Sequence, residues 1–132
     1  MKTRIGLVTV LTDNVQELAE FYSSVLGFKE SYTTDDYVEF ENEGVRFAVC
    51  ARSTMHQFTN HDSYKQKRQG QSFELAFPLP SSKAVEEAYK EIVKKGALPI
   101  HEPHDTPWMR RTAMFADPEG NIHELYGPRT DT

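Results

Sequence analysis

Short alternating stretches and one helical segment make up the hydrophobic pattern of the first half of the chain. In residues 5–11, alternate side chains fall on opposite faces of a strand, with Leu7, Thr9 and Leu11 together on one face. Apolar residues then recur at helical spacing between Asn14, a suitable N-cap, and Gly27, a suitable helix end. The pattern predicts a strand over 5–11, a helix over 14–27, and strands over 28–32, 37–41 and 45–51.

The second half repeats this order after a polar segment. Residues 52–71 lack periodicity and contain the basic run 65–68, so we interpret them as a connector with room for a helical turn. Ser82 is then a suitable N-cap for a helix that ends at Gly96. The predicted elements are a strand over 72–79, a helix over 82–96, strands over 98–101, 110–116 and 121–126, and a frayed tail over 128–132.

Both halves therefore predict the order βαβββ, which indicates an α+β fold of two similar modules. We expect one domain over 1–132, made of module 4–51, connector 52–71 and module 72–127. Each predicted sheet packs one face against its helix. Two such sheets can curl into a cup with the helices outside, and their other faces would line a pocket for a small ligand.

The last predicted hairpin contains the first candidate functional residue. Asp117, Pro118 and Gly120 are typical of a tight turn, because they supply a side-chain acceptor, a fixed φ and backbone freedom. Beyond the turn, alternation places Glu124 on the same strand face as Ile122 and Tyr126. A carboxylate among apolar neighbours must be paired, bind a metal or change its pKa, so Glu124 is the first candidate for chemistry.

Composition narrows the class of protein. The chain has 132 residues, 38% of them hydrophobic and 27% charged, which is typical of a globular domain. A net charge of −5 argues against a nucleic-acid surface. The single cysteine, Cys50, excludes an intrachain disulfide and is best interpreted as a buried thiol. The sequence has neither a signal-peptide pattern nor a long apolar run, so we expect a soluble, cytoplasmic protein without membrane contact.

Two segments give the chain a family resemblance. The end of the first helix, Glu20-Phe21-Tyr22-Ser23-Ser24-Val25-Leu26-Gly27-Phe28, and the final hairpin, Asp117-Pro118-Glu119-Gly120-Asn121-Ile122-His123-Glu124-Leu125, combine with the double βαβββ order. Together they resemble the glyoxalase, bleomycin-resistance and extradiol-dioxygenase group, the vicinal oxygen chelate superfamily. The resemblance extends from Ile5 to Gly127. It implies a glyoxalase-like cup with a pocket, and a homodimer.

The resemblance also implies where a metal would bind. The four ligand positions of the family correspond to Leu7, Ala48, Glu74 and Glu124. Only the two glutamates have donor atoms, so the sequence departs from the four-ligand isomerase pattern. It also departs from the dioxygenase pattern of two histidines and one glutamate. We therefore expect either no cofactor or a weakly held divalent metal on Glu74 and Glu124.

Our leading functional hypothesis is binding or sequestration of a small organic ligand, as the resemblance to the bleomycin-resistance branch implies. The alternative is a metal-dependent lyase, isomerase or dioxygenase of the glyoxalase type, with Glu74 and Glu124 as ligands. A third possibility is a structural or regulatory module whose pocket is filled by side chains. The candidate catalytic residue is Glu124, and the candidate ligand-binding residues are Leu7, Thr9, Arg46, Ala48, Cys50, Glu74, Ala76, Trp108 and Tyr126.

Two of these candidates have alternative roles. Arg46 shares a strand face with Ala48 and Cys50, and it can neutralise Glu74 or Glu124. Trp108 either stacks on a planar ligand at the rim of the pocket or clamps its own hairpin.

The histidines are weaker candidates for a metal site. We expect His101 and His104 in a loop, because Pro103 lies between them. His123 should point to the strand face opposite Glu124, so it cannot share a ligand with that carboxylate.

Overall fold

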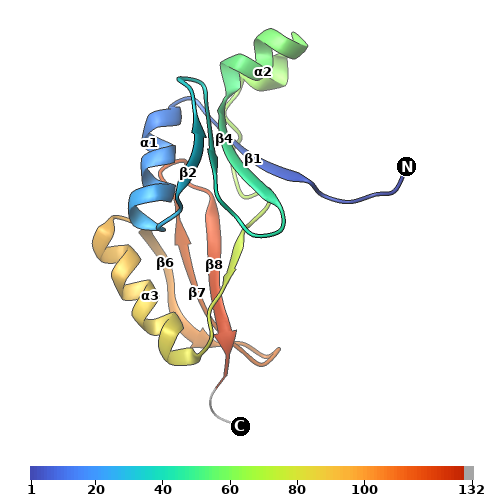
Figure 1. The fold of residues 1–132 in the computed structure, drawn as a ribbon. Helices are drawn as coiled ribbons and strands as arrows, with labels where there is room; N and C mark the ends of the chain where they lie inside the picture. The colour runs from blue at the N-terminus through green and yellow to red at the C-terminus, as the bar shows by residue number, and fades with distance from the viewer. Residues whose placement is uncertain (130–132) are drawn as a thin grey trace. The chain divides into compact units, whose positions relative to one another are not determined.

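The computed structural model describes residues 1–129, which form two compact units that meet in sequence at Gln69 and Gly70 (Figure 1). Each unit contains one four-stranded mixed sheet, and the fold class is α+β as predicted. The repeated βαβββ order is confirmed, with additional helical segments between the two repeats. Among the described residues, no helix is long and apolar enough to span a membrane.

The first unit has the strand order β1-β4-β3-β2, with the outer strand β1 parallel to β4. The helix begins as predicted, because the Asn14 side chain accepts a hydrogen bond from the Glu17 backbone N–H at 3.1 Å. The elements are β1 (Leu7–Thr12), α1 (Val15–Glu20), the π-helical turn η1 (Phe21–Val25), β2 (Glu30–Thr33), β3 (Tyr37–Phe40), β4 (Arg46–Ala51), α2 (Arg52–Thr59) and the 3₁₀ turn η2 (Asp62–Lys65).

Aromatic rings form the core between this sheet and its helix. Tyr22, on η1, is fully buried, and its ring centroid lies 5.1 Å from that of Phe47 on β4. Phe40 and Phe28 pack against the same ring of Phe47, at centroid distances of 5.6 and 5.2 Å. Alternation along β3 and β4 therefore directs Val38, Phe40 and Phe47 to the helix and their neighbours to the opposite face.

The second unit has the strand order β5-β8-β7-β6, with β5 parallel to β8. Its helix is capped by Ser81, not by Ser82 as predicted, because the Ser81 hydroxyl accepts from the Ala84 N–H at 3.0 Å. Ser82 is buried, and its hydroxyl donates to the Pro128 carbonyl at 2.6 Å instead. The elements are β5 (Ala76–Pro78), α3 (Ser82–Lys95), β6 (Leu98–Asp105), β7 (Arg110–Ala116) and β8 (Ile122–Pro128).

Two predicted strands have different bounds in the structure, and the connector is more helical than predicted. Of the strand predicted over 72–79, only β5 forms. The residues before it make isolated hydrogen bonds instead, such as those of the Gln71 side chain with both backbone groups of Ile122. The strand predicted over 98–101 continues to Asp105 through two register shifts, which accommodate prolines that cannot donate to the ladder. The connector contains the eight-residue helix α2, which is longer than the helical turn expected there and has no buried residue.

The turn before β8 forms as predicted. The Asp117 carboxylate accepts from the backbone N–H groups of Glu119 and Asn121, at 2.9 and 3.0 Å. The Gly120 N–H donates to the Asp117 carbonyl at 2.9 Å, and Gly120 has a φ of +84° that favours glycine. These local bonds set the register in which β8 begins. The part of the predicted tail that covers 130–132 lies outside the described residues.

Candidate functional site

Alternation along β8 gives the second sheet two distinct faces. His123, Leu125 and Gly127 are buried on the face that packs against α3. At Gly127, an added Cβ would lie 3.1 Å from Val85 on that helix, so the close packing favours glycine. Glu124 is half-buried and points to the opposite face, as predicted. We call this opposite face the Glu124 face; its residues are Glu74, Ala76, Thr112, Met114, Glu124 and Tyr126.

The two glutamates of this face form a carboxyl pair. The Glu124 N–H donates to the Leu75 carbonyl at 2.9 Å, and Ala76 is paired with Glu124 in the sheet, which brings Glu74 beside it. Burial raises the pKa of the Glu124 carboxyl, and the negative charge of Glu74 and a hydrogen bond with it raise this pKa further. The nearby charge of His104 acts in the opposite direction. This environment therefore favours the protonated form of Glu124 more than water favours that of a lone glutamate.

Thr112 adds a second polar group to the same face. It is 3% exposed and is paired with Tyr126 on β8 and with His104 on β6. Its hydroxyl oxygen is buried and has no hydrogen-bond partner within residues 1–129. An unpaired buried hydroxyl costs free energy, so Thr112 is a candidate contact for a polar ligand atom. Sequence patterns did not select it, because threonine is common in strands.

The histidines of this unit lie in strands. His101 and His104 belong to β6, not to a loop, and their ring centroids are 4.1 Å apart. The Nδ1 atoms of His101 and His104 lie 2.7 and 3.2 Å, respectively, from the Glu102 carbonyl oxygen. His123 is fully buried on the face opposite Glu124, which confirms the prediction for its direction. Its Nδ1 accepts from the Leu75 N–H at 3.1 Å, so it has a structural role.

The predicted positions of the first unit also share one face. Sheet register pairs Leu7 with Arg46, Thr9 with Ala48 and Leu11 with Cys50, on the side opposite the aromatic core. Ala48 and Cys50 are buried, and burial is the largest cause that raises the pKa of the Cys50 thiol. The thiol is therefore inert rather than nucleophilic, as we interpreted it from the sequence.

Arg46 has a different partner from those we expected. Its guanidinium donates two hydrogen bonds to the Glu39 carboxylate, at 2.7 and 2.8 Å, and the Tyr37 hydroxyl donates to the same carboxylate at 2.6 Å. The Arg46 and Tyr37 hydrogen bonds lower the pKa of Glu39 to about 2, and burial with the Glu39 contact raises the pKa of Tyr37 to about 12. Arg46 therefore pairs with Glu39, and the prediction that it neutralises Glu74 or Glu124 was wrong.

Trp108 lies at the tip of the hairpin between β6 and β7. Its side chain is 66% exposed, which does not fit a clamp on its own hairpin. The tip is held instead by Thr106, whose hydroxyl accepts from the Arg110 N–H at 3.1 Å, and by Arg129, which donates to the Thr106 carbonyl at 3.2 Å. The structure therefore presents Trp108 on an ordered turn, while a ligand contact for it stays a prediction.

Comparison with known proteins identifies the family. The family model for the Glyoxalase/Bleomycin resistance protein/Dioxygenase superfamily matches residues 4–125. The chain belongs to this superfamily. A relative in Bacillus subtilis (strain 168), the uncharacterized protein YraH, is 28% identical over 123 residues, which cover 90% of this chain and 94% of YraH.

Solved structures of the superfamily share the fold. A glyoxalase/bleomycin resistance protein/dioxygenase from Nocardioides has a TM-score of 0.88 at 23% identity, over 100% of this chain and 87% of that one. A lactoylglutathione lyase from Agrobacterium tumefaciens has a TM-score of 0.68 at 17% identity, over 96% and 95% of the two chains. At these identities the structural similarity supports the fold alone.

The donor atoms do not fit a complete divalent-metal site of the superfamily. Leu7 and Ala48 cannot ligate a metal, and Glu74 and Glu124 share a hydrogen bond that a metal would have to replace. Within residues 1–129, no three His, Cys, Asp or Glu side chains lie where they could hold one metal ion. The carboxyl groups of the Glu124 face can act by hydrogen bonding and proton transfer without such a site.

Proposed function

We propose that this superfamily member binds a small organic molecule on the Glu124 face. The observation that carries the proposal is the Glu74–Glu124 pair, in which burial and the neighbouring carboxylate favour the protonated form of Glu124. The protonated form of the Glu124 carboxyl can donate a hydrogen bond, and the oxygens of Glu74 can accept one. The unpartnered Thr112 hydroxyl offers a third polar contact beside them.

The chemistry of the pair favours ligands with both a hydrogen-bond acceptor and a donor or cationic group. Ala76, Met114 and Tyr126 supply apolar surface around the acids. Most ligand pockets combine an apolar lining with a few polar groups in this way. We expect uncharged or cationic organic compounds to bind, and simple inorganic anions to be repelled by Glu74.

Substitutions at Glu124 separate binding from proton transfer. Glu124→Gln keeps an N–H donor in place of the carboxylic O–H, so ligand affinity should remain close to that of the wild type. Glu124→Ala should weaken binding about tenfold or more, because it removes a hydrogen bond worth about 1.5–3 kcal/mol when the partner is charged. Glu87→Ala on α3 is the matched control, since Glu87 is exposed and forms a helical salt bridge with Lys83 at 3.7 Å, away from the Glu124 face.

The measurement is a thermal-shift screen of uncharged and cationic aromatic compounds, followed by calorimetry on the hits. Equal affinities for the wild type and Glu124→Ala would contradict the proposed site. A metal assay tests the alternative of a metal-dependent lyase, isomerase or dioxygenase. One tightly held Ni, Zn, Mn or Fe ion per chain, lost in Glu124→Ala, would overturn the binding proposal and support catalysis.

A further inference from the structure

Strand β6 contains a bulge between His101 and His104 that the proposed function does not use. β6 is the edge strand of the second sheet, and its residue His101 is paired with Met114 on β7. His104 is paired with Thr112, so three steps along β6 correspond to two steps along β7, and one residue of β6 is extra. The bulge fits this place because Pro103 cannot donate to the ladder and edge strands tolerate such residues.

The bulge places both histidines on one face of the sheet. In a regular strand, residues three positions apart point to opposite faces. Directly paired residues of neighbouring strands share a face, and both Met114 and Thr112 belong to the Glu124 face. The extra residue therefore brings His101 and His104 to this same face, where their ring centroids are 4.1 Å apart. His101 is exposed and His104 is half-buried, so a dissolved ion can reach the pair.

The carbonyl oxygen of Glu102, inside the bulge, sets the tautomer of both rings. It lies 2.7 Å from Nδ1 of His101 and 3.2 Å from Nδ1 of His104. A carbonyl oxygen only accepts hydrogen bonds, so in each neutral ring Nδ1 carries the proton and Nε2 has a lone pair. Within residues 1–129, neither Nε2 has a hydrogen-bond partner. Both rings therefore offer Nε2 as a ligand atom.

We propose that His101 and His104 bind one transition-metal ion through their Nε2 atoms. A histidine that ligates a metal typically donates its other ring N–H to a carboxylate or a backbone carbonyl, as both rings do here. Metal–nitrogen bonds of about 2.0–2.1 Å place two nitrogens on one ion at most about 4.2 Å apart. The separation of the ring centroids is of this size. Imidazole suits Zn²⁺, Ni²⁺ and Cu²⁺, whereas Mg²⁺ and Ca²⁺ prefer oxygen ligands.

This site differs from the metal position that the superfamily resemblance implies. Neither histidine occupies one of those four positions, and the site does not depend on the proposed binding of an organic molecule. Two imidazoles supply half of the tetrahedral coordination of Zn²⁺, so water or donor atoms of a small molecule would complete it. Two protein ligands hold an ion less tightly than the three or four of a complete site, so we expect exchangeable rather than permanent binding.

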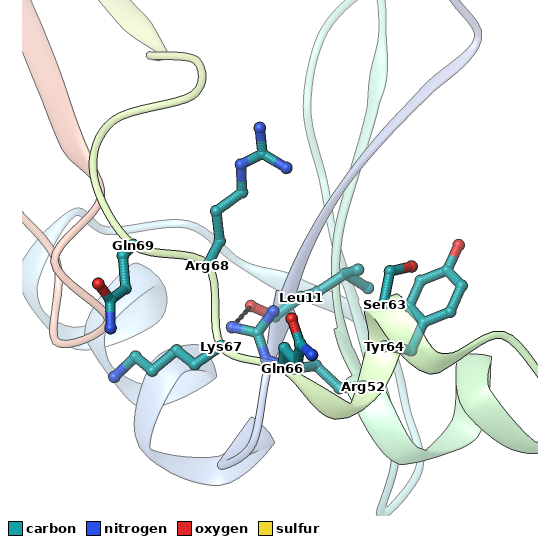
Figure 2. A pocket seen from close by; sticks show the side chains of 8 residues that line it. All are labelled: Leu11, Arg52, Ser63, Tyr64, Gln66, Lys67, Arg68 and Gln69. Carbon is teal, nitrogen blue, oxygen red and sulfur yellow. Dashed lines mark hydrogen bonds between the residues drawn. The ribbon is translucent and has the colours of Figure 1, made fainter.

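The other three histidines are less suited to bind a metal. The Nε2 of His56 is buried, and His123 is fully buried. His61 is exposed, but its Nδ1 accepts from the Ser63 N–H at 3.2 Å, so its neutral ring has the proton on Nε2. Ser63 also lines the cavity of the first unit (Figure 2). Among the described residues, the lining of this cavity includes no histidine, cysteine, aspartate or glutamate that could add a metal ligand.

Calorimetry with Zn²⁺ and Ni²⁺ on the untagged full chain tests the proposal. At least one of these metals should bind with a Kd below about 100 μM. His101→Gln and His104→Gln should each weaken this binding about tenfold or more, because each removes one of the two imidazole ligands. Failure of both metals to bind would overturn the proposal, as would equal affinities for the wild type and both variants.

The matched control is His61→Gln, which removes one exposed imidazole in the first unit and should keep the wild-type affinity. Weakening by His61→Gln equal to that by the β6 variants would show scattered binding to surface histidines and overturn the proposal. Glu124→Gln distinguishes the site from a metal on the carboxyl pair. Binding that is lost in Glu124→Gln but unchanged in His101→Gln and His104→Gln would place the ion on the carboxyl pair and contradict the site.

Amide chemical shifts give an independent location for the ion. On titration with the metal that binds, the signals of residues 101–104 and of their β7 neighbours 112–114 should change first. Changes that begin at residues 56–61 would place the ion at the histidines of the first unit and refute the site on β6.

Discussion

His123 allows the tertiary packing of the second unit to be tested at one atom. The ring is fully buried among Phe73, Phe77 and Phe115, at centroid distances of 6.5, 6.2 and 5.8 Å. Its Nδ1 accepts the Leu75 N–H at 3.1 Å, so the neutral ring has its proton on Nε2. That nitrogen lies 3.6 Å from the Asp117 carboxylate. His123 thus links the approach to β5 with the turn before β8.

Replacement of His123 by Phe keeps a planar ring but removes both polar atoms. The part-buried Leu75 N–H then loses its acceptor, which costs about 1–3 kcal/mol. We expect the free energy of unfolding to fall by about 2 kcal/mol and the Tm by about 8 °C. Urea denaturation gives the first quantity and calorimetry the second. His101→Phe is the matched control at an exposed histidine, with an expected change within about 0.5 kcal/mol.

Hydrogen exchange distinguishes this explanation from a general packing defect. The Leu75 amide should lose protection in His123→Phe and keep more of it in His123→Asn, whose Oδ1 can replace Nδ1 as acceptor. A His123→Phe variant as stable as the wild type would refute the reasoning. Equal exchange of the Leu75 amide in the wild type and both variants would do the same.

Three further predictions concern the turn and the two carboxyl networks. Asp117→Ala removes the acceptor for the Glu119 and Asn121 N–H groups, so urea denaturation should show a loss of about 2 kcal/mol; an unchanged midpoint would contradict this. The pKa of Glu39 is lowered to about 2, so its contribution to the free energy of unfolding should be complete above pH 4.5 and disappear as the pH falls towards 2. A stability difference between the wild type and Glu39→Gln that does not depend on pH would exclude this contribution. The pKa of Glu124 is raised above 4.5, so the wild type should lose stability relative to Glu124→Gln as the pH rises above 4.5. The opposite trend would show that the folded protein lowers the pKa of Glu124.

Local sequence signals were sufficient for much of the fold. The Asn14 cap and the turn from Asp117 to Gly120 are closed by hydrogen bonds between residues at most four positions apart. The direction of Glu124 followed from alternation along one strand, which requires only that the strand forms. These features were predicted correctly because each depends on a few neighbouring residues.

Contacts between distant residues were not predictable in this way. Arg46 binds Glu39 because the hairpin register brings them together, although charge alone allowed Glu74 or Glu124 as partners. The bond between His123 and Leu75 joins positions 48 residues apart. Helix α2 lies in a polar segment and has no buried residue, so no core-facing pattern predicted its full length.

The sequence by itself determined the repeated βαβββ order, the turn before β8 and the face on which Glu124 lies, since short-range geometry controls these features. Only the tertiary structure decided which polar groups became partners. It paired Glu74 with Glu124, left the Thr112 hydroxyl without a partner among residues 1–129, and collected Arg52, Lys67 and Arg68 around one cavity. The physical reason is that pairing depends on sheet register and on where a connector lies, and both are set by packing between residues far apart in sequence.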